Sequence, residues 1–172
     1  MTDKLNLKSK RFLIWMIVAV AVVIADQVTK WAIIQHIQYG GRVPTSFSFL
    51  NLVHQQNEGA AWSFLADAGG WQRYFFIVLA TVVSVVIGVW LWRIRNEGPL
   101  ILAAGLALVL GGAVGNLVDR ILLGHVTDFI QVWFGSWAFP SFNVADAAIT
   151  VGAAFLIIDS LFGSGRATPE KE

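Results

Sequence analysis

Apart from Asp159 near the end of the last apolar stretch, which we interpret as an interfacial carboxylate, four aspartates lie within or beside long apolar stretches of the sequence, where acidic side chains are rare. Asp26 and Asp146 fall inside such stretches, Asp119 falls at the end of a third, and Asp128 follows in the next segment. A charged residue within a membrane span costs roughly 2.5–3.5 kcal/mol even on lenient insertion scales, and it marks a functional site by default. The sequence has no cysteine, which excludes thiol nucleophiles and cysteine metal sites. Carboxyl groups are therefore the first candidates for chemistry.

Asp128 and Asp146 differ from the other two because no Lys or Arg stands near them in the sequence. Asp26 precedes Lys30 by four residues, the favourable order for an ion pair on a helix, and Asp119 directly precedes Arg120. We expect these neighbours to neutralise Asp26 and Asp119. Two uncompensated carboxyl groups held close in a poorly solvated site cannot both ionise cheaply, so they share a proton. One can then act as base on water while the other acts as acid toward a carbonyl oxygen, which is the chemistry of amide hydrolysis.

Two asparagines are spaced to accompany these acids. Asn116 precedes Asp119 by three residues, and Asn143 precedes Asp146 by three. Residues three apart on a helix share a face, so we expect each helix to present an amide beside a carboxyl group. Asp146 taken alone could equally be a helix cap, since acidic residues are favoured at helix starts.

Other catalytic arrangements fit the residues less well. His125 precedes Asp128 by three residues and could be a metal ligand or a base, but the other two histidines lack a ligand-like spacing to it. Ser63 and Lys30 could suggest a serine–lysine dyad, yet no nucleophile elbow surrounds Ser63. We therefore predict neither a metal nor a cofactor.

The chain that must position these residues has the composition of a membrane protein. It has 172 residues, of which 56% are hydrophobic and 13% charged, with a mean hydropathy of +0.66. Four stretches approach the roughly 20 residues that a helix needs to cross the hydrocarbon core, namely 12–34, 71–92, 100–120 and 142–162. Isolated segments in lipid must be helical to satisfy their own backbone hydrogen bonds. We predict an all-α membrane protein, with residues 1–172 forming a single four-helix bundle.

The distribution of basic residues predicts the orientation of the bundle. Short loops rich in Lys and Arg stay in the cytoplasm. The basic residues before the first span, between the second and third, and after the fourth are Lys4, Lys8, Lys10, Arg11, Arg93, Arg95, Arg166 and Lys171. Both termini are therefore expected in the cytoplasm. A cleaved signal peptide is the alternative for the first span, but its apolar run continues past Asp26 to Ile34, which favours a retained helix.

The two segments on the opposite side, 35–70 and 121–141, are expected to be periplasmic and to contain a small β element. Residues 45–54 alternate and are rich in β-forming types, and 129–139 contains a turn candidate at Gly135. In this orientation the four aspartates described above gather near the periplasmic boundary. The active site is therefore predicted near the periplasmic face.

Five ordered motifs carry a resemblance to a known family. They read Asp-Gln-Val-Thr-Lys at 26–30, Asn-Glu-Gly-Ala-Ala-Trp-Ser at 57–63, Gly-Asn-Leu-Val-Asp-Arg at 115–120, Val-Thr-Asp-Phe-Ile at 126–130 and Phe-Asn-Val-Ala-Asp at 142–146. In this order and spacing they make the chain resemble the bacterial lipoprotein signal peptidases, also called signal peptidase II. The resemblance covers most of the chain and leaves only the two tails outside.

The resemblance implies an activity, a substrate and a set of site residues. Members of the family work in the bacterial inner membrane. They cleave the signal peptide from prolipoproteins before a cysteine that already carries a diacylglyceryl group, and globomycin inhibits them. By motif match, Asp128 and Asp146 are the catalytic pair. The residues that would support this pair and bind substrate are Asp26, Lys30, Asn57, Gly59, Asn116, Asp119, Arg120 and Asn143.

The sequence departs from the family motifs at two positions, and the resemblance also implies partners and an oligomeric state. Trp62 stands where the family commonly has Phe, and Glu58 stands where it commonly has Thr or a small residue, which affects only details of the substrate groove. The expected partners are the diacylglyceryl-prolipoprotein and membrane lipid, and the expected state is a monomer.

Aspartates inside membrane spans, taken alone, are also compatible with two other functions. A small transporter or proton channel would use the aspartates as relay groups, but it needs polar residues through the middle of the spans, where 78–89 and 100–110 contain only Thr81 and Ser84. A non-catalytic assembly factor would use the polar cluster for helix packing. Nucleic-acid binding is not expected, because the formal net charge is only +1.

Overall fold

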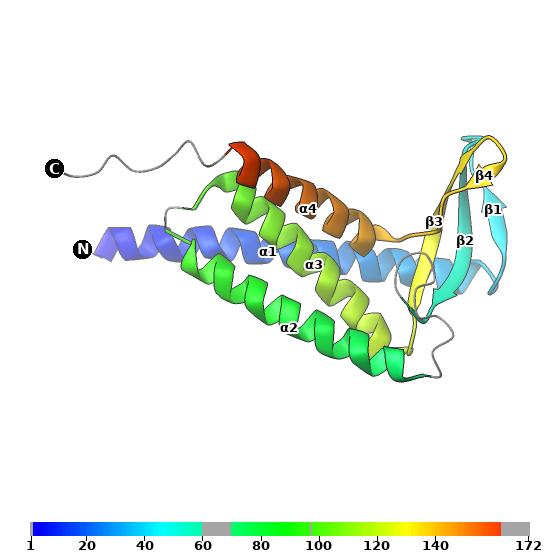
Figure 1. The fold of residues 1–172 in the computed structure, drawn as a ribbon, viewed down its shortest axis with the longest axis horizontal. Helices are drawn as coiled ribbons and strands as arrows, with labels where there is room; N and C mark the ends of the chain where they lie inside the picture. Colours follow the sequence, from blue (N-terminus) through cyan, green and yellow to red (C-terminus); the bar gives the residue numbers. More distant parts are fainter. Residues whose placement is uncertain (1, 60–69, 97, 163–172) are drawn as a thin grey trace.

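The computed structural model describes residues 2–59, 70–96 and 98–162. Its elements in chain order are α1 (Thr2–His36), β1 (Arg42–Pro44), β2 (Leu50–Asn57), α2 (Trp71–Arg93), α3 (Leu100–Leu122), β3 (Val126–Phe134), β4 (Trp137–Ala138) and α4 (Val144–Phe162). The helices form a bundle, and the strands form a sheet beyond one end of it (Figure 1). The start of α1, the α2–α3 connection and the end of α4 all lie at the opposite end of the bundle.

All four helices are long and apolar enough to cross a membrane. The qualifying segments are Lys10–His36, Trp71–Arg93, Leu100–Leu122 and Val144–Phe162, with mean hydropathies between 1.8 and 2.5. Helix α3 packs against each of the other three, and most of its apolar window is buried, whereas the other helices leave most of theirs exposed. An apolar surface of this size is expected where helices face lipid. The four predicted apolar helices are thus confirmed.

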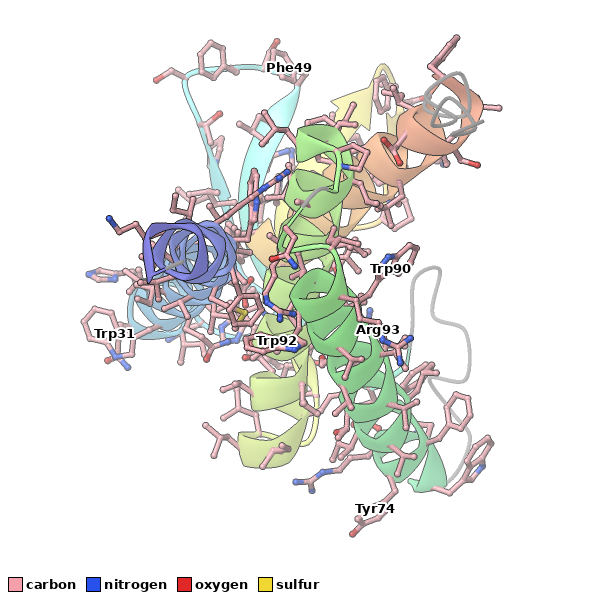
Figure 2. The ribbon with its side chains drawn as sticks, turned by 90° about the vertical axis from the view of Figure 1, so that its left-hand side faces the viewer. Trp31, Phe49, Tyr74, Trp90, Trp92 and Arg93 are labelled. Atoms are coloured by element: carbon pink, nitrogen blue, oxygen red, sulfur yellow. The ribbon has the colours of Figure 1, made fainter. Side chains whose placement is uncertain are left out.

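Aromatic side chains are prominent on the exposed helix surfaces. Figure 2 shows Trp31 on α1 and Tyr74 on α2 pointing away from the bundle, and their exposed fractions are 62% and 68%. Residues of this kind combine an apolar ring with a polar edge, which suits the region between hydrocarbon and water.

Glycines allow α3 and α4 to approach closely. A Cβ atom on Gly105 would lie 2.9 Å from the carbonyl oxygen of Gly152, and one on Gly152 would lie 2.7 Å from the carbonyl oxygen of Gly105. Gly112 faces the backbone of Ala145, at the start of α4, and a Cβ atom there would also lie 2.7 Å from the Ile149 side chain. This contact sets the distance between the helix that carries Asn116 and the helix that carries Asp146.

We predict that Gly112→Ala destabilises the protein, because the new methyl group would push α4 away from α3. Overpacking of this kind costs about 1–3 kcal/mol. The matched control is Gly88→Ala on α2, where no atom lies within 4 Å of the added methyl group. Thermal unfolding in detergent should show a lower midpoint for Gly112→Ala and little change for Gly88→Ala, whereas equal midpoints would contradict the packing argument.

The strands form one antiparallel sheet in the order β1-β2-β3-β4. Strands β2 and β3 pair from Leu50 opposite Val132 to Asn57 opposite Val126, with a shift of register between Leu52 and Gln55. The predicted β element is thus confirmed, including its turn, where Gly135 has a φ of 63°.

The limits of the first long strand were predicted incorrectly. Residues 45–49 form a turn, because the hydroxyl group of Thr45 accepts a hydrogen bond from the backbone N–H of Phe47 at 3.1 Å and donates one to the carbonyl oxygen of Leu50 at 2.8 Å. Strand β2 therefore begins at Leu50 and continues to Asn57. This extension brings Asn57 to the end of the sheet that faces the helices.

Candidate active site

Asp128 and Asp146 come from different elements and are joined through one asparagine. Asp128 lies on β3, and Asp146 lies in the first turn of α4. The side-chain amide of Asn143 donates a hydrogen bond to Asp128 Oδ1 at 2.7 Å, and the backbone N–H of Asn143 donates to Asp146 Oδ2 at 3.3 Å. Both carboxyl groups therefore lie around Asn143.

The backbone just before α4 explains why these two elements meet. Phe142 exchanges backbone hydrogen bonds with Ile130 of β3, at 2.8 and 3.0 Å. Asn143 follows as the residue before the helix, and its side-chain oxygen accepts a hydrogen bond from the backbone N–H of Asp146 at 2.9 Å. Together with the reverse bond to the Asp146 carboxyl group, this arrangement is a capping box. Asn143 is therefore the cap of α4, and Asp146 completes the capping box as well as being a member of the pair.

Each carboxyl group accepts a second hydrogen bond from another asparagine. Asn57 Nδ2 donates to Asp128 Oδ2 at 3.1 Å, and Asn116 Nδ2 donates to Asp146 Oδ1 at 2.8 Å. Both oxygens of each acid are thus held by N–H donors. Asn116 and Asn143 occupy the positions beside carboxyl groups that their spacing predicted, although Asn116 contacts Asp146 of a different helix.

A buried ion network lies behind the pair. The Lys30 ammonium group lies 2.8 Å from Asp26 Oδ2 and 3.0 Å from Asp119 Oδ2, and it donates to Asn116 Oδ1 at 3.0 Å. A lysine has three N–H donors, and these three contacts use all of them. Lys30, Asp26 and Asp119 are each no more than 2% exposed. The expected Asp26–Lys30 pair is present.

Arg120 does not form a close ion pair with Asp119, although the two are adjacent in the sequence. We expected Arg120 to neutralise Asp119 because the two residues are adjacent. Neighbouring residues on a helix point in different directions, however, and the cation beside Asp119 is Lys30. Arg120 instead donates through Nη2 to the carbonyl oxygen of Gly59 at 2.7 Å, and its guanidinium carbon lies 4.9 Å from the centre of the Phe76 ring. Arg120 therefore links α3 to α2 and to the segment that follows β2.

Two further residues complete the network and were not singled out from the sequence. Gln27 Nε2 donates to Asp119 Oδ1 at 2.9 Å and to the carbonyl oxygen of Gly115 at 3.1 Å. The backbone N–H of Thr127 donates to Asp119 Oδ2 at 3.0 Å. Gln27 could have been found from the sequence, because it is a polar residue inside an apolar span. Thr127 could not, because its contribution comes from its backbone N–H and does not depend on its side chain.

The Asp128 carboxyl group has a strongly perturbed environment. Burial, reinforced by the negative charge of Asp146, raises the pKa of Asp128 to about 7, although hydrogen bonds from Asn57 and Asn143 oppose the shift. A carboxyl group with such a pKa can hold a proton at neutral pH and release it during a reaction. This is the behaviour required of one member of an acid–base pair.

The rival catalytic residues can be placed only in part. Lys30 is committed to the buried ion network, and Ser63 lies outside the described residues. His125 lies in the turn between α3 and β3, where burial lowers its pKa. Among the residues that the structure describes, no three His, Cys, Asp or Glu side chains form a group suited to a metal ion.

Comparisons with known proteins agree on one family. Residues 18–162 match the family described as Signal peptidase (SPase) II. The lipoprotein signal peptidase of Acinetobacter baumannii is 49% identical over 150 residues, covering 87% of this chain and 84% of the relative. That of Ectopseudomonas mendocina is 47% identical over 166 residues, covering 95% and 97%.

Solved structures give the same result for the fold. A bacterial membrane enzyme with 33% sequence identity superimposes with a TM-score of 0.76, covering 92% of this chain and 93% of the other. A second structure of a bacterial membrane enzyme gives a TM-score of 0.73 with 34% identity. Because the matches extend over nearly the whole chain, this protein belongs to the signal peptidase II family, the lipoprotein signal peptidases, and is a multi-pass membrane protease.

Proposed function

We propose that this protein is an aspartic endopeptidase that removes signal peptides from diacylglyceryl-modified prolipoproteins by cleaving before the lipidated cysteine. The observation that carries the proposal is the joining of Asp128 and Asp146 through Asn143, with each carboxyl group held by two N–H donors. Membership of the lipoprotein signal peptidase family supports the choice of substrate.

The proposed reaction uses one water molecule and one proton held by the carboxyl pair. The ionised member takes a proton from the water as it attacks the scissile carbonyl carbon, and the protonated member hydrogen-bonds the carbonyl oxygen. The tetrahedral intermediate then collapses as the leaving amine receives a proton. The fixed N–H donors reduce reorganisation of the carboxyl groups during these steps.

The supporting residues divide into two groups in this proposal. Asp26, Lys30, Asn116, Asp119 and Asn143 hold the pair in place through the contacts described above. Asn57 belongs to both groups, because it donates to Asp128 and also lies with Gly59 and Arg120 where residues 58–59, directly after β2, meet α3. These three residues would bind the substrate backbone. Two of their contacts tie this segment together, since the backbone N–H of Gly59 donates to Asn57 Oδ1 at 3.0 Å and Arg120 donates to the Gly59 carbonyl oxygen.

The proposed location is the bacterial inner membrane, with both termini in the cytoplasm and the sheet and the carboxyl pair at the periplasmic face. The support is the concentration of Lys and Arg around the helix ends that lie opposite the sheet. Reporter fusions after Arg95 and after Gly69 should read out cytoplasm and periplasm respectively. The reversed pattern would exclude this orientation.

Cleavage of a lipidated precursor peptide by the purified protein is the direct test. We expect a peptide that carries diacylglyceryl-cysteine to be cleaved before that cysteine, and the same peptide without lipid to react at least about tenfold more slowly. Burial of an acyl chain contributes roughly 0.8 kcal/mol per methylene, so burying only two would give about this preference. The assay measures kcat/KM for both peptides with the protein as a monomer in detergent. Equal values would argue against recognition of the lipid.

A further inference from the structure

We infer that Lys30, by orienting the side-chain amide of Asn116, makes Asp146 the ionised member of the pair and leaves the shared proton on Asp128. The inference rests on the proposed function, because it assigns roles within that reaction. Lys30 and Asn116 are then positioning residues, which act on the chemistry through Asp146.

The orientation of the Asn116 amide is set by a neighbouring group that can donate hydrogen bonds but cannot accept them. The Lys30 ammonium group has no acceptor, so the atom that faces it at 3.0 Å must be the oxygen Oδ1. Asn143 Nδ2 lies 3.3 Å from the same oxygen and also donates to it. A flipped amide would place an NH₂ group against an ammonium group. The Asn116 NH₂ group is therefore directed at Asp146.

Asp146 sits at the end of this chain and in a location that favours negative charge. The hydrogen bond from Asn116 to Asp146 Oδ1 is 2.8 Å long, and it is the last step of a chain that begins at a cation, which strengthens it. Asp146 also lies in the first turn of α4, where the unpaired N–H groups of the helix attract an anion. The backbone N–H of Asn143 adds a contact to Oδ2.

Asp128 has the environment expected of the protonated partner. It lies on a strand rather than in the first turn of a helix, and it is 4% exposed, whereas Asp146 is partly exposed. Its side-chain donors Asn57 and Asn143 are oriented by neutral backbone N–H groups, those of Gly59 and Asp146. Its pKa of about 7 agrees with a retained proton.

The charges around the pair support a single retained proton. The groups that face it are Asp26 and Lys30 on α1, Asp119 and Arg120 on α3, Asp128 on β3 and Asp146 on α4. Two cations thus face four carboxyl groups. Removing the last proton would leave two uncompensated negative charges in a poorly solvated site, which is costly.

The assignment fixes the direction of each proton transfer. Asp146 takes a proton from water as the water oxygen bonds to the carbonyl carbon, while Asp128 gives its proton to the carbonyl oxygen. When the carbon–nitrogen bond breaks, Asp146 delivers its proton to the leaving nitrogen, and Asp128 takes one back from a hydroxyl group of the intermediate. The products are a carboxylic acid and an amine, and both aspartates return to their starting states.

A pair of matched asparagine variants tests the assignment through the pH profile of kcat/KM for the lipidated peptide. Asn116→Ala removes a donor that stabilises the first negative charge of the pair, so the acidic limb should move up by about one pH unit while the alkaline limb stays in place. Asn57→Ala removes a donor to Asp128 and should move only the alkaline limb, upwards, from the value near pH 7 that the pKa of Asp128 leads us to expect. A residue with a merely structural role would lower the rate without moving either limb.

Infrared titration shows which carboxyl group ionises first without requiring a substrate. Difference spectra against the double variant Asp128→Asn/Asp146→Asn isolate the protonated carboxyl band of the pair, which should titrate in two steps. Asn116→Ala should raise the lower step and Asn57→Ala the upper one. Lys30→Gln, which removes the charge but keeps an N–H donor, should move the lower step in the same direction as Asn116→Ala.

The outcomes separate this inference from the proposed function. If the two asparagine variants move the opposite steps from those expected, or both move the same step, the assignment is overturned. It is also overturned if folded Lys30→Gln protein leaves the lower step in place; where that variant does not fold, the two asparagine variants decide the question. Failure of the wild type to cleave the lipidated peptide would instead refute the proposed function, while the infrared titration would still report which carboxyl group ionises first.

Discussion

Replacing either member of the carboxyl pair should abolish turnover while leaving the protein folded. Asp128→Asn and Asp146→Asn keep the size of the side chain and one oxygen that can accept one of the two existing hydrogen bonds. Each removes a group that must gain or lose a proton in the proposed mechanism. Loss of one member of a cooperative catalytic unit costs about 10⁴-fold or more in kcat. The measurement is kcat for the lipidated peptide, with thermal unfolding as the check on folding.

The ion network supplies a control for this result. Asp119→Asn lies close to the pair but outside it, and it leaves Lys30 with Asp26 as an ionic partner. It should reduce the rate far less than either pair variant. A pair variant that keeps more than about 1% of wild-type kcat would show that its carboxyl group does not carry the chemistry.

Lys30→Met should have the second largest effect, and it should act on folding. Methionine is similar in length but cannot compensate Asp26 and Asp119, which are 0% and 2% exposed and both lie within 3.0 Å of the lysine nitrogen. Removing one partner of a buried ion pair costs about 3–5 kcal/mol. We expect a large loss of folded protein, measured as the free energy of unfolding in detergent.

The same substitution elsewhere on α1 separates the loss of the ion network from the loss of a lysine. Lys10 is exposed, so Lys10→Met should change stability by less than about 0.5 kcal/mol. Adding Asp26→Asn and Asp119→Asn to Lys30→Met should recover part of the lost stability, because it removes the uncompensated charges. If Lys30→Met and Lys10→Met were equally stable, the network would not contribute to folding.

The sequence predicts the helices well because their signal is local. Each span is a long apolar run, and lipid leaves a single chain segment no alternative to a helix. The aspartates and asparagines at 26, 116, 119, 143 and 146 stand out for the same reason, since polar residues are conspicuous against apolar surroundings. Asp128 is different: it lies outside the spans, and only the missing basic neighbour and the motif distinguished it.

The partners of these residues were harder to predict because they depend on how the helices pack. Lys30 was expected to pair with Asp26, but its contacts to Asp119 and Asn116 arise only when α1 lies against α3. The Arg120 assignment failed because adjacency in the sequence was used where direction around the helix decides the contact. The start of β2 was missed because the Thr45 hydroxyl group competes for backbone hydrogen bonds.

The double role of Asn143 has a consequence for biogenesis. Its amide caps the last helix and also holds Asp128, so the start of that helix and the reactive pair form together. A nascent chain whose fourth hydrophobic segment has not yet left the translocon lacks Asp146 and the cap at once. If the pair carries the proposed reaction, proteolytic activity therefore requires that the fourth helix has been inserted and capped.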